Sequence, residues 1–437
     1  PNSRPLEPPM DANADAEPPM HIVLFPWLAF GHMIPFLELA ERLAARGHRV
    51  SFVSTPRNIT RLPPAVGVQF VALPLPRVDG LPDGAEATTD LPPGNTELLL
   101  HRASDGLAAG PFCAFLDDQK PDWLVVDSFQ YLAAAAAADR GLPSAMFLVF
   151  DSASTVLWGV PRVSPDVDPE LGASVPQRFM LTYQTCNIVA QRCCLEFDPE
   201  GVPLLPGIFG NKPFFPVGLL PPPLRDNLGG DDLVSWLDTH PAKSVVYVAL
   251  GSEAPLTIQL VHELAIGLEL AGTPFLWALR KLSGGDQDNN DILPPGFQER
   301  TKGRGLVAMG MVPQTRMLAH ASVGAFLTHS GPSSVIEGMQ YGHPLVMLPF
   351  FGDQRNVARF MEGKKVGLPV PRNGDDGTSF DRQGIASIIR AVVVDEEGRH
   401  VFASNAKKMQ QIVADTTIHE RCITEFLHQL RSYKEDQ

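Results

Sequence analysis

The segment 311–354 contains side chains that suit a nucleotide diphosphate, in the order in which a strand, a turn and a helix would present them. Its apolar run 323–328 predicts a buried parallel strand, and the residues that follow predict the start of a helix. Ser333 and Ser334 would lie in the first helical turn, where unpaired backbone N–H groups and the positive end of the helix dipole attract phosphate. Glu337 follows one turn later, within reach of two ribose hydroxyls. The spacing therefore predicts a nucleotide-diphosphate site.

His32 is the candidate for proton transfer in the first half of the chain. The apolar run 21–26 predicts a strand, and the amphipathic stretch 34–46, which Gly47 can end, predicts a helix. His32 would lie in the loop between them, at the carboxyl edge of a parallel sheet, where ligands of such sheets bind. A single loop histidine is more often a solvated surface residue, so its position alone leaves both interpretations open.

Asp127 is the candidate partner of this histidine. It ends the predicted strand 123–127, so it would emerge at the same edge of the sheet as His32. A carboxylate there can orient an imidazole and stabilise its charged form while it removes a proton from a hydroxyl. The alternative is a strand-end aspartate that caps the next helix, predicted over 132–139. We favour a His32–Asp127 dyad.

The segment 311–354 resembles the signature box of the plant UDP-sugar-dependent glycosyltransferases. That box has the same length and runs W-x-P-Q, then H-C-G-W-N-S, then E, then D-Q at these spacings. The matching positions are Pro313, Gln314, His329, Gly331, Ser334, Glu337, Asp353 and Gln354. The sequence G-H-x-x-P around His32 matches the family's catalytic-histidine motif.

The resemblance implies a set of donor-binding residues. Along the chain, it assigns the uracil to Met311, Val312 and Gln314, the diphosphate to His329 and Ser334, the ribose to Glu337, and the sugar hydroxyls to Asp353 and Gln354. Gly331 and Ser333 belong to the same box. The family also uses a serine near the diphosphate at the position of Ser252, although a Gly-Ser pair after a strand is otherwise a generic turn.

A few positions depart from the family's pattern. Met311 stands where the family has a tryptophan that stacks on uracil, so an aromatic contact worth about 1 kcal/mol is exchanged for a softer thioether contact. Ser330 replaces a cysteine. Pro332 and Ser333 replace a Trp–Asn pair that lies against the sugar and the phosphates, and proline removes a backbone donor there. These departures bear on the transferred sugar more than on the UDP site.

Length and charge favour a two-domain enzyme. The 437 residues exceed the usual size of a single core, and two domains of about 200 residues each are expected. The 35 basic and 49 acidic residues give a net charge of -14 without a Lys/Arg stripe, which argues against a nucleic-acid partner. No apolar stretch reaches the about 18 residues that span a bilayer, and no signal pattern opens the chain. We expect a cytoplasmic monomer without stable membrane insertion.

Cysteine usage agrees with a reducing compartment. The cysteines are odd in number and form no C-x-x-C pair or zinc-ligand cluster: Cys113, Cys186, Cys193, Cys194 and Cys422. The simplest interpretation is a set of buried thiols.

Strand and helix patterns alternate in two sets, which predicts a parallel sheet in each half of the chain. The predicted strands are 22–25, 50–54, 68–73, 123–127 and 145–150 in the first set, and 244–250, 275–279, 305–308, 323–328 and 345–348 in the second. The resemblance implies the same α/β architecture, in which two Rossmann-like domains face each other across a cleft, called the GT-B fold.

The predicted organisation follows from these patterns. Residues 1–9 resemble a cloning-vector scar ahead of a natural start at Met10, 10–215 form an N-terminal acceptor-binding domain, 216–232 a linker, 233–415 a C-terminal UDP-sugar-binding domain, and 416–437 a helix returning to the first domain. The Pro-rich stretch 152–177 is predicted to be irregular.

No metal and no cofactor are expected beyond the UDP-sugar, which is a co-substrate. Asp166 and Asp168 have the D-x-D spacing of metal-dependent transferases, but prolines flank them and no strand precedes them, so a solvated acidic loop is the better interpretation. A helix dipole, His329 and Ser334 can offset the charge of the leaving diphosphate instead.

Trp27, Phe129 and Phe150 lie at predicted sheet edges of the first domain and would either line an apolar acceptor site or belong to the core. The expected reaction is a single in-line displacement with inversion, because the motifs that form the cleft contain no second carboxylate suited to act as a nucleophile.

Beyond the box, the runs 47–59, 249–253, 342–345 and 351–354 resemble the branch of the family that adds a sugar to a sugar on a terpenoid or flavonoid. The resemblance covers nearly all of 20–434. Steviol-glycoside glucosyltransferases and saponin or flavonoid glycoside rhamnosyltransferases fall in it. The intact Asp353-Gln354 pair favours glucose as the transferred sugar, and the change at Pro332-Ser333 keeps UDP-rhamnose as the alternative. A UDP-sugar epimerase or an inactive UDP-sugar-binding protein are alternatives of another class.

Overall fold

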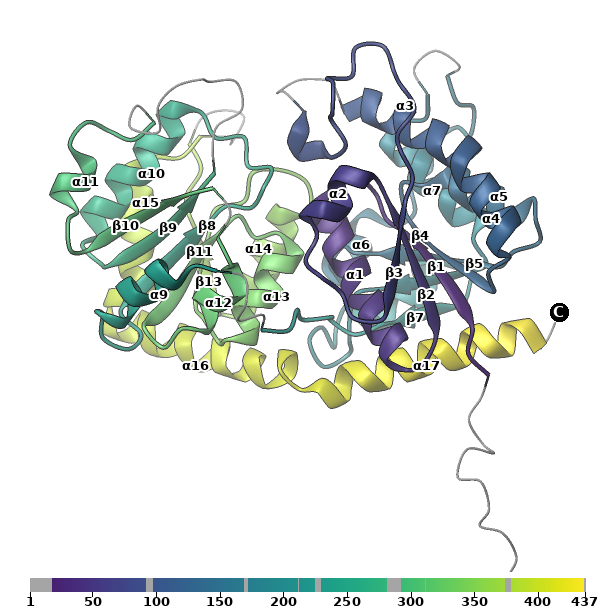
Figure 1. Cartoon of the computed structure of the whole chain (residues 1–437). Helices are drawn as coiled ribbons and strands as arrows, with labels where there is room; N and C mark the ends of the chain where they lie inside the picture. The colour runs from purple at the N-terminus through teal and green to yellow at the C-terminus, as the bar shows by residue number, and fades with distance from the viewer. Residues whose placement is uncertain are drawn as a thin grey trace, which may run out of the picture.

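The chain folds into two α/β domains that lie side by side (Figure 1). The structure is a computed structural model and describes residues 18–91, 97–168, 172–210, 212–224, 229–280, 292–310, 312–373 and 379–435. The predicted scar 1–9, the start at Met10 and the donor-site residue Met311 lie outside the described residues.

The first domain is built on a seven-stranded parallel sheet in the order β3-β2-β1-β4-β5-β6-β7. Its strands are β1(His21–Phe25), β2(Arg49–Ser54), β3(Val68–Ala72), β4(Trp123–Asp127), β5(Ser144–Leu148), β6(Ile188–Gln191) and β7(Phe214–Pro216). The first five correspond to the predicted strands. β6 and β7 were not predicted, because they have only four and three residues and β7 ends in proline, a residue that cannot donate to a ladder.

The second domain has a six-stranded parallel sheet in the order β10-β9-β8-β11-β12-β13. Its strands are β8(Val245–Ala249), β9(Phe275–Leu279), β10(Gly305–Met309), β11(Val323–Thr328), β12(Leu345–Met347) and β13(Gly367–Pro369). All but the three-residue β13 were predicted. β1, β4, β5 and β8 are buried along their whole length, because helices cover both faces of each sheet. The prediction of two Rossmann-like domains with parallel sheets is confirmed.

Helices pack around the two sheets. In the first domain they are α1(Phe30–Ala45), α2(Pro56–Arg61), α3(Glu97–Leu107), α4(Cys113–Gln119), α5(Tyr131–Ala138), α6(Ser152–Trp158), α7(Val175–Thr185) and α8(Leu205–Ile208). From the linker onward they are α9(Asp231–Asp238), α10(Ile258–Ala271), α11(Phe297–Arg300), α12(Gln314–Ala319), α13(Pro332–Gln340), α14(Gln354–Gly363), α15(Arg382–Ile389), α16(Glu396–Val413) and α17(Thr416–Glu435). Short helical turns add η1(Thr88–Asp90), η2(Ala108–Phe112), η3(Val202–Leu204) and η5(Arg390–Val394).

The prediction that 152–177 is irregular is wrong at both ends. Helix α6 occupies the first part, and the Asp151 side chain caps it by accepting from the backbone N–H of Ser154 at 2.9 Å. Helix α7 begins at Val175, where Ser174 and Gln177 form a capping box. Both caps are visible in the sequence, but the prolines between them favoured the prediction of an irregular segment.

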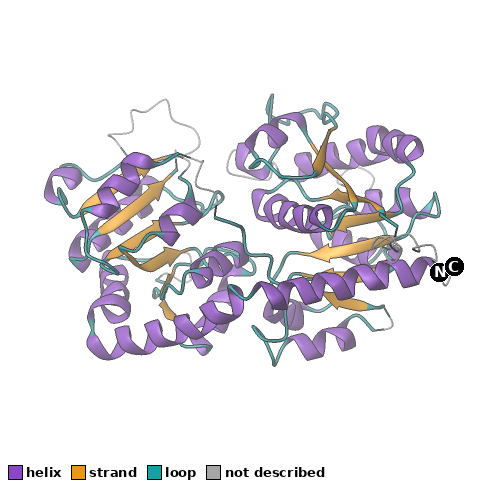
Figure 2. Cartoon of the chain, turned by 60° about the horizontal axis from the view of Figure 1, so that its bottom comes forward, coloured by secondary structure: helices purple, strands orange, loops and turns teal. Residues whose placement is uncertain are grey.

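The long helix α17 leaves the second domain and lies along the first (Figures 1 and 2). Phe426, Leu427 and Leu430 are buried in the core of the first domain. The indole N–H of Trp123 donates to the carbonyl of Leu430 at 3.0 Å, which ties the helix to β4. The returning helix predicted within 416–437 is therefore present, and it joins the two domains a second time.

Candidate active site

His32 lies in the first turn of α1, which corrects its predicted place in a loop before the helix. The helix starts at Phe30, because the carbonyl of Ala29 accepts from the backbone N–H groups of His32 and Met33 at 2.9 and 2.8 Å. Gly31 and Pro35 disfavour helix and conceal this start in the sequence. The His32 side chain is 13% exposed.

The structure brings His32 and Asp127 together. The two side chains meet through His32 Nδ1 and Asp127 Oδ2 at 2.8 Å, and Asp127 is fully buried at the end of β4. The other carboxylate oxygen accepts from Ser128 Oγ at 3.3 Å and from the Phe129 backbone N–H at 3.2 Å. Helix α5 is preceded by Gln130 as its N-cap, so the helix-capping alternative for Asp127 is not what the structure has.

This contact prepares His32 to accept a proton. Burial acts to lower the pKa of His32, but the charge and the hydrogen bond of Asp127, together with Glu253 and Asp353, outweigh burial and raise the pKa. With Nδ1–H donated to Asp127, Nε2 is the nitrogen left to take a proton. Glu253 and Asp353 belong to the second domain, so the histidine of the first domain feels charges from across the domain interface.

The turn between β11 and α13 holds His329 between two glycines. A Cβ on Gly331 would lie 2.4 Å from His329 Nε2, and one on Gly251 would lie 2.7 Å from His329 Cε1. Burial, with the nearby charge of Arg280, lowers the pKa of His329 to about 4, so the ring is neutral at pH 7. Its buried Nδ1 has no hydrogen-bond partner among the described residues. A neutral imidazole of this kind can donate one N–H to a phosphate.

Helix α13 starts at Pro332, with Gly331 as its N-cap, and this places Ser333 and Ser334 in the first turn as predicted from the sequence. The backbone N–H groups of this turn have no acceptor within the helix. Ser252 is exposed in the loop after β8, next to Gly251 and therefore near His329. The turn, the two serines and Ser252 form one end of the predicted donor site.

Glu337 and Gln314 form the other end of that site. Gln314 Nε2 donates to Glu337 Oε2 at 2.6 Å. Burial raises the pKa of Glu337 to about 7, although Gln314 and Arg192 act against it. Val312, two residues before Gln314, is half-buried. The predicted uracil and ribose residues that the structure describes are thus adjacent.

Asp353 and Gln354 lie at the start of α14, where Asp353 is the N-cap residue. Burial and the charge of Asp151 raise the pKa of Asp353 to about 7, whereas His32 acts to lower it. Gln354 is buried, and its Oε1 accepts from the Phe350 backbone N–H at 2.8 Å. Its amide oxygen is therefore used within its own loop, and the amide nitrogen is the group left for a sugar hydroxyl.

Of the aromatic residues predicted at the acceptor side, two flank the histidine. The rings of Phe129 and Phe150 lie 5.4 and 5.7 Å from the His32 ring. Trp27 is only 2% exposed and stacks on His101 at 4.0 Å, which places it in the core. An acceptor role stays a prediction for Phe129 and Phe150, and the core alternative holds for Trp27.

Three charged residues near these groups were not predicted from the sequence. Arg280 follows β9 and donates to the backbone carbonyls of Ser252 and Ala254. Arg192 follows β6, and Asp151 lies between β5 and α6, where its buried Oδ2 has no partner among the described residues. A charge just after a strand, the signal that identified Asp127, would have identified Arg280. Arg192 was hidden because β6 was not predicted.

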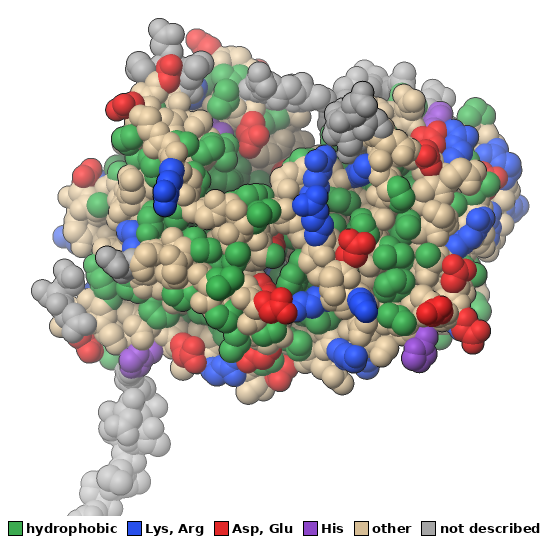
Figure 3. All heavy atoms as spheres, turned by 180° about the vertical axis from the view of Figure 1, so that it is seen from behind, with side chains coloured by type: hydrophobic (Ala, Val, Ile, Leu, Met, Phe, Trp, Pro, Cys, Tyr) green, Lys and Arg blue, Asp and Glu red, His purple; other side chains and the backbone are tan. Residues whose placement is uncertain are grey.

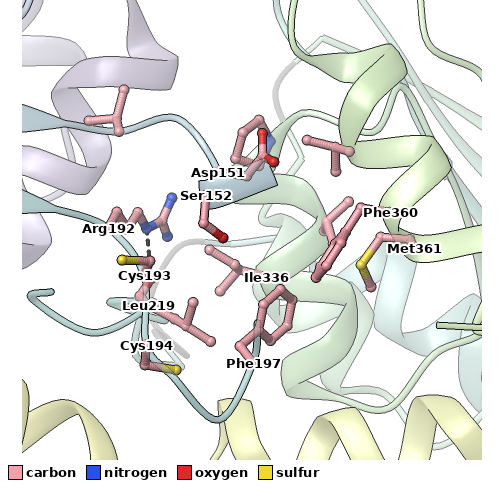
Figure 4. Close-up of a pocket in the computed structure, with 14 residues that line it drawn as sticks. Asp151, Ser152, Arg192, Cys193, Cys194, Phe197, Leu219, Ile336, Phe360 and Met361 are labelled. Atoms are coloured by element: carbon pink, nitrogen blue, oxygen red, sulfur yellow. Dashed lines mark hydrogen bonds between the residues drawn. The ribbon is translucent and has the colours of Figure 1, made fainter. Parts of the chain in front are cut away.

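Asp151 and Arg192 line a small interdomain cavity of about 30 Å³ (Figure 4). The first domain contributes these residues and the Cys193-Cys194 pair, and helices α13 and α14 contribute Ile336, Phe360 and Met361. Burial raises the pKa of the Cys193 and Cys194 thiols, as expected for inert buried cysteines. The first domain therefore packs closely against helices α13 and α14, which carry residues of the predicted donor site.

Surface charge, helix hydropathy and the grouping of side chains that can bind metal indicate which kinds of partner the described part of the chain can bind. On the face seen in Figure 3, acidic and basic side chains are interspersed without a broad Lys/Arg patch. Within the described ranges, no helix is long and apolar enough to cross a membrane. In the same part of the chain, no three His, Cys, Asp or Glu side chains are grouped to hold a metal ion. Asp166 and Asp168 are exposed in a loop.

Comparison with known proteins gives the class. The family described as UDP-glucoronosyl and UDP-glucosyl transferase matches residues 225–418, and a glycosyl transferase 4-like domain matches residues 35–185. UDP-glycosyltransferase 91D2 of Stevia rebaudiana is 38% identical over 466 aligned residues, which cover 96% of this chain and 96% of that protein. Soyasaponin III rhamnosyltransferase of Glycine max is 33% identical, over 95% of this chain and 96% of its own length.

Solved structures show the same fold. UGT89C1 of Arabidopsis thaliana, complexed with UDP-L-rhamnose, is 25% identical with a TM-score of 0.79, over 95% of this chain and 100% of that one. UGT73P12 of Glycyrrhiza uralensis, complexed with glycyrrhetinic acid 3-O-monoglucuronide, has a TM-score of 0.78 at 20% identity, over 96% and 97% of the two chains.

The fold, the matched families and the relatives define a glycosyltransferase that uses a UDP-sugar, with the GT-B architecture of inverting enzymes. The chain belongs to the plant family-1 UDP-glycosyltransferases, in the branch that contains UDP-glycosyltransferase 91D2 and soyasaponin III rhamnosyltransferase.

Proposed function

We propose that this enzyme transfers glucose from UDP-glucose to a hydroxyl of a glycosylated plant natural product, such as a terpenoid or flavonoid glycoside. The observation that carries the proposal is the contact between His32 and Asp127 at 2.8 Å, with Phe129 and Phe150 beside the imidazole. A base flanked by aromatic rings is better suited to remove a proton from the hydroxyl of an apolar acceptor than from a water molecule.

In the proposed reaction, neutral His32 removes the acceptor proton while Asp127 stabilises the imidazolium. The acceptor oxygen attacks the anomeric carbon in line with the departing UDP, which inverts the configuration. The diphosphate leaves toward His329 and the first turn of α13, where N–H donors and the helix dipole offset its charge. No metal or cofactor enters this scheme.

Support for glucose comes from Asp353 and Gln354 at the start of α14, which keep the residue types of the family's sugar-binding pair. Rhamnose is the second candidate donor sugar. It is favoured by Pro332 and Ser333 at the positions that lie against the sugar, and by the similarity to a soyasaponin rhamnosyltransferase and to a structure with UDP-L-rhamnose. The proposal also includes a terpenoid or flavonoid as the aglycone of the acceptor, a monomeric enzyme and a cytoplasmic location.

A donor and acceptor panel tests the proposal. UDP-glucose, UDP-rhamnose and UDP-galactose are each incubated with mono- and diglycosylated terpenoids and flavonoids, and UDP release is measured with and without acceptor. The proposal predicts acceptor-dependent release that is fastest with UDP-glucose, with one more hexose on the acceptor by mass. An epimerase would release little UDP while converting the UDP-sugar, and an inactive binding protein would form neither product.

A further inference from the structure

Arg192 is a buried cation of the first domain that reaches the start of α13 in the second. It directly follows β6 and is 4% exposed. Its Nη1 donates to Ser333 Oγ at 2.7 Å, which makes a hydrogen bond across the domain interface. Figure 4 shows its guanidinium on the first-domain side of the interdomain cavity, with Ile336 on the opposite side.

All the hydrogen-bond partners that the structure describes for Arg192 are neutral. Its Nε donates to the Leu219 carbonyl at 2.6 Å and its Nη2 to the Leu220 carbonyl at 3.1 Å. Glu337 and Glu38 act on it as more distant charges, and burial lowers its pKa to about 10, so it is still charged at pH 7. A buried cation without a close anion is costly. An anion bound beside it would relieve this cost.

The hydrogen bond from Arg192 also decides what the Ser333 hydroxyl can do. Because Ser333 Oγ accepts from a cation, its own proton is free to be donated elsewhere, and the hydroxyl is a stronger donor for being polarised. Ser333 is the second residue of α13, and Pro332 before it has no N–H. The hydroxyl can therefore replace a donor that the proline removes from this helix start.

The linker holds Arg192 in place. The backbone N–H of Leu219 donates to His419 Nδ1 at 3.2 Å, which ties the arginine's acceptor segment to α17. Leu220 adopts a left-handed conformation with φ of 50°, unusual for a residue with a Cβ. Since the carbonyls of both residues face Arg192, the guanidinium has a fixed position from which to meet Ser333.

We propose that Arg192 is a positioning residue of the donor site. Its hydrogen bond directs the Ser333 hydroxyl at the diphosphate of the UDP-sugar, and that diphosphate supplies the anion that the buried guanidinium lacks. The inference rests on the proposed use of α13 as the diphosphate-binding helix. It adds a first-domain cation to a donor site otherwise formed by the second domain, so that donor binding draws on both domains.

Calorimetric titration with UDP and with uridine tests the inference, because uridine lacks the diphosphate. The titrations are run at about pH 9, where Glu337 is ionised with or without the nearby charge of Arg192. There, Arg192→Gln should weaken UDP binding by at least about tenfold, the effect of one charge-assisted hydrogen bond, and leave uridine binding within about twofold of wild type. Ser333→Ala should weaken UDP binding and spare uridine in the same way. In the double variant the loss should be clearly smaller than the product of the two single losses, because the residues act through one hydrogen bond.

Arg46→Gln is the matched control. Arg46 is another first-domain arginine with a long-range contact, to Glu420 on α17, and its described side-chain hydrogen bonds go to Arg42 and Glu420, not to α13. It should bind UDP and uridine as wild type does. If Arg192→Gln does not fold, as judged by its thermal unfolding, Ser333→Ala alone decides: a loss confined to UDP supports the inference.

Equal weakening of UDP and uridine, unchanged UDP binding, or multiplicative losses in the double variant would overturn the inference. Transfer is measured separately on the same samples. A wild-type enzyme that binds UDP but transfers no sugar contradicts the proposed function and not the role of Arg192, whereas normal transfer with unchanged UDP binding in both single variants contradicts only the role of Arg192.

Discussion

Gln314 Nε2 donates a hydrogen bond to Glu337 Oε2 at 2.6 Å, and this bond joins a predicted uracil-binding residue to the predicted ribose-binding residue of the donor site. Burial raises the pKa of Glu337 to about 7, so near neutral pH the carboxyl group is divided between its two protonation states. Two ribose hydroxyls both need an acceptor, which the ionised carboxylate provides and the protonated one provides less well.

Uridine affinity should therefore depend on the protonation of Glu337. Lowering the pH from about 8 to about 6 should weaken uridine binding by up to about tenfold. The reason is that the ionised fraction of Glu337, whose pKa is about 7, falls about tenfold between these two pH values. Glu337→Gln should bind uridine weakly at both pH values. Uridine is used because it has no phosphate that titrates in this range. A wild-type affinity independent of pH would contradict the assignment.

Asp353 should make the free enzyme less stable as pH rises. Its pKa is about 7 in the folded protein, above the unfolded value, so the folded state holds the proton through the window from about 4 to 7 and stability falls as pH rises through it. Asp353→Asn should raise the free energy of unfolding at about pH 8 by on the order of 1 kcal/mol and change it little at about pH 4. Urea denaturation at both pH values measures this. A loss of stability at pH 8 would be the opposite result.

Gly331 should tolerate no side chain, because a Cβ there would lie 2.4 Å from His329 Nε2. Gly331→Ala should displace the imidazole and reduce kcat/KM for the UDP-sugar by at least about tenfold. Gly363→Ala is the control, since a Cβ at the end of α14 has no neighbour within 4 Å. Steady-state kinetics with varied UDP-sugar decide, and equal activity of both variants would show that His329 need not stay in place.

Helix α17 should contribute to the stability of the first domain through its buried face. Phe426→Ala should lower the free energy of unfolding by about 3–5 kcal/mol, as large-to-small changes in a core do. His428→Ala on the exposed face of the same helix should stay within about 0.5 kcal/mol of wild type. Chemical denaturation of both variants tests whether the returning helix is part of the core.

The strands that carry long apolar runs could be predicted from the sequence, and with them the fold and the edge on which His32 and Asp127 meet. β6, β7 and β13 could not, because three or four residues give no periodicity and none of the three lies in a longer predicted run, as the equally short β12 does in 345–348. The loss of β6 from the prediction also concealed Arg192. Local signals thus sufficed for strands that lie in longer apolar runs, and failed for the shortest strands, including β6, which is fully buried.

The electrostatics of the site depend on burial, and burial is a property of the fold. The sequence places Glu337 and Asp353 in the donor box, but their raised pKa values follow from desolvation and from neighbours such as Asp151. The pairing of Arg192 with Ser333 joins residues 141 positions apart across two domains. No spacing in the chain encodes such a contact.

The most direct test of the account is turnover by His32→Ala, measured together with UDP binding. Removing the base should reduce kcat by at least about 100-fold, because general-base catalysis contributes at least that much, while the affinity for UDP stays close to wild type. Turnover retained at wild-type rate with UDP still bound would contradict the catalytic role of the His32–Asp127 dyad.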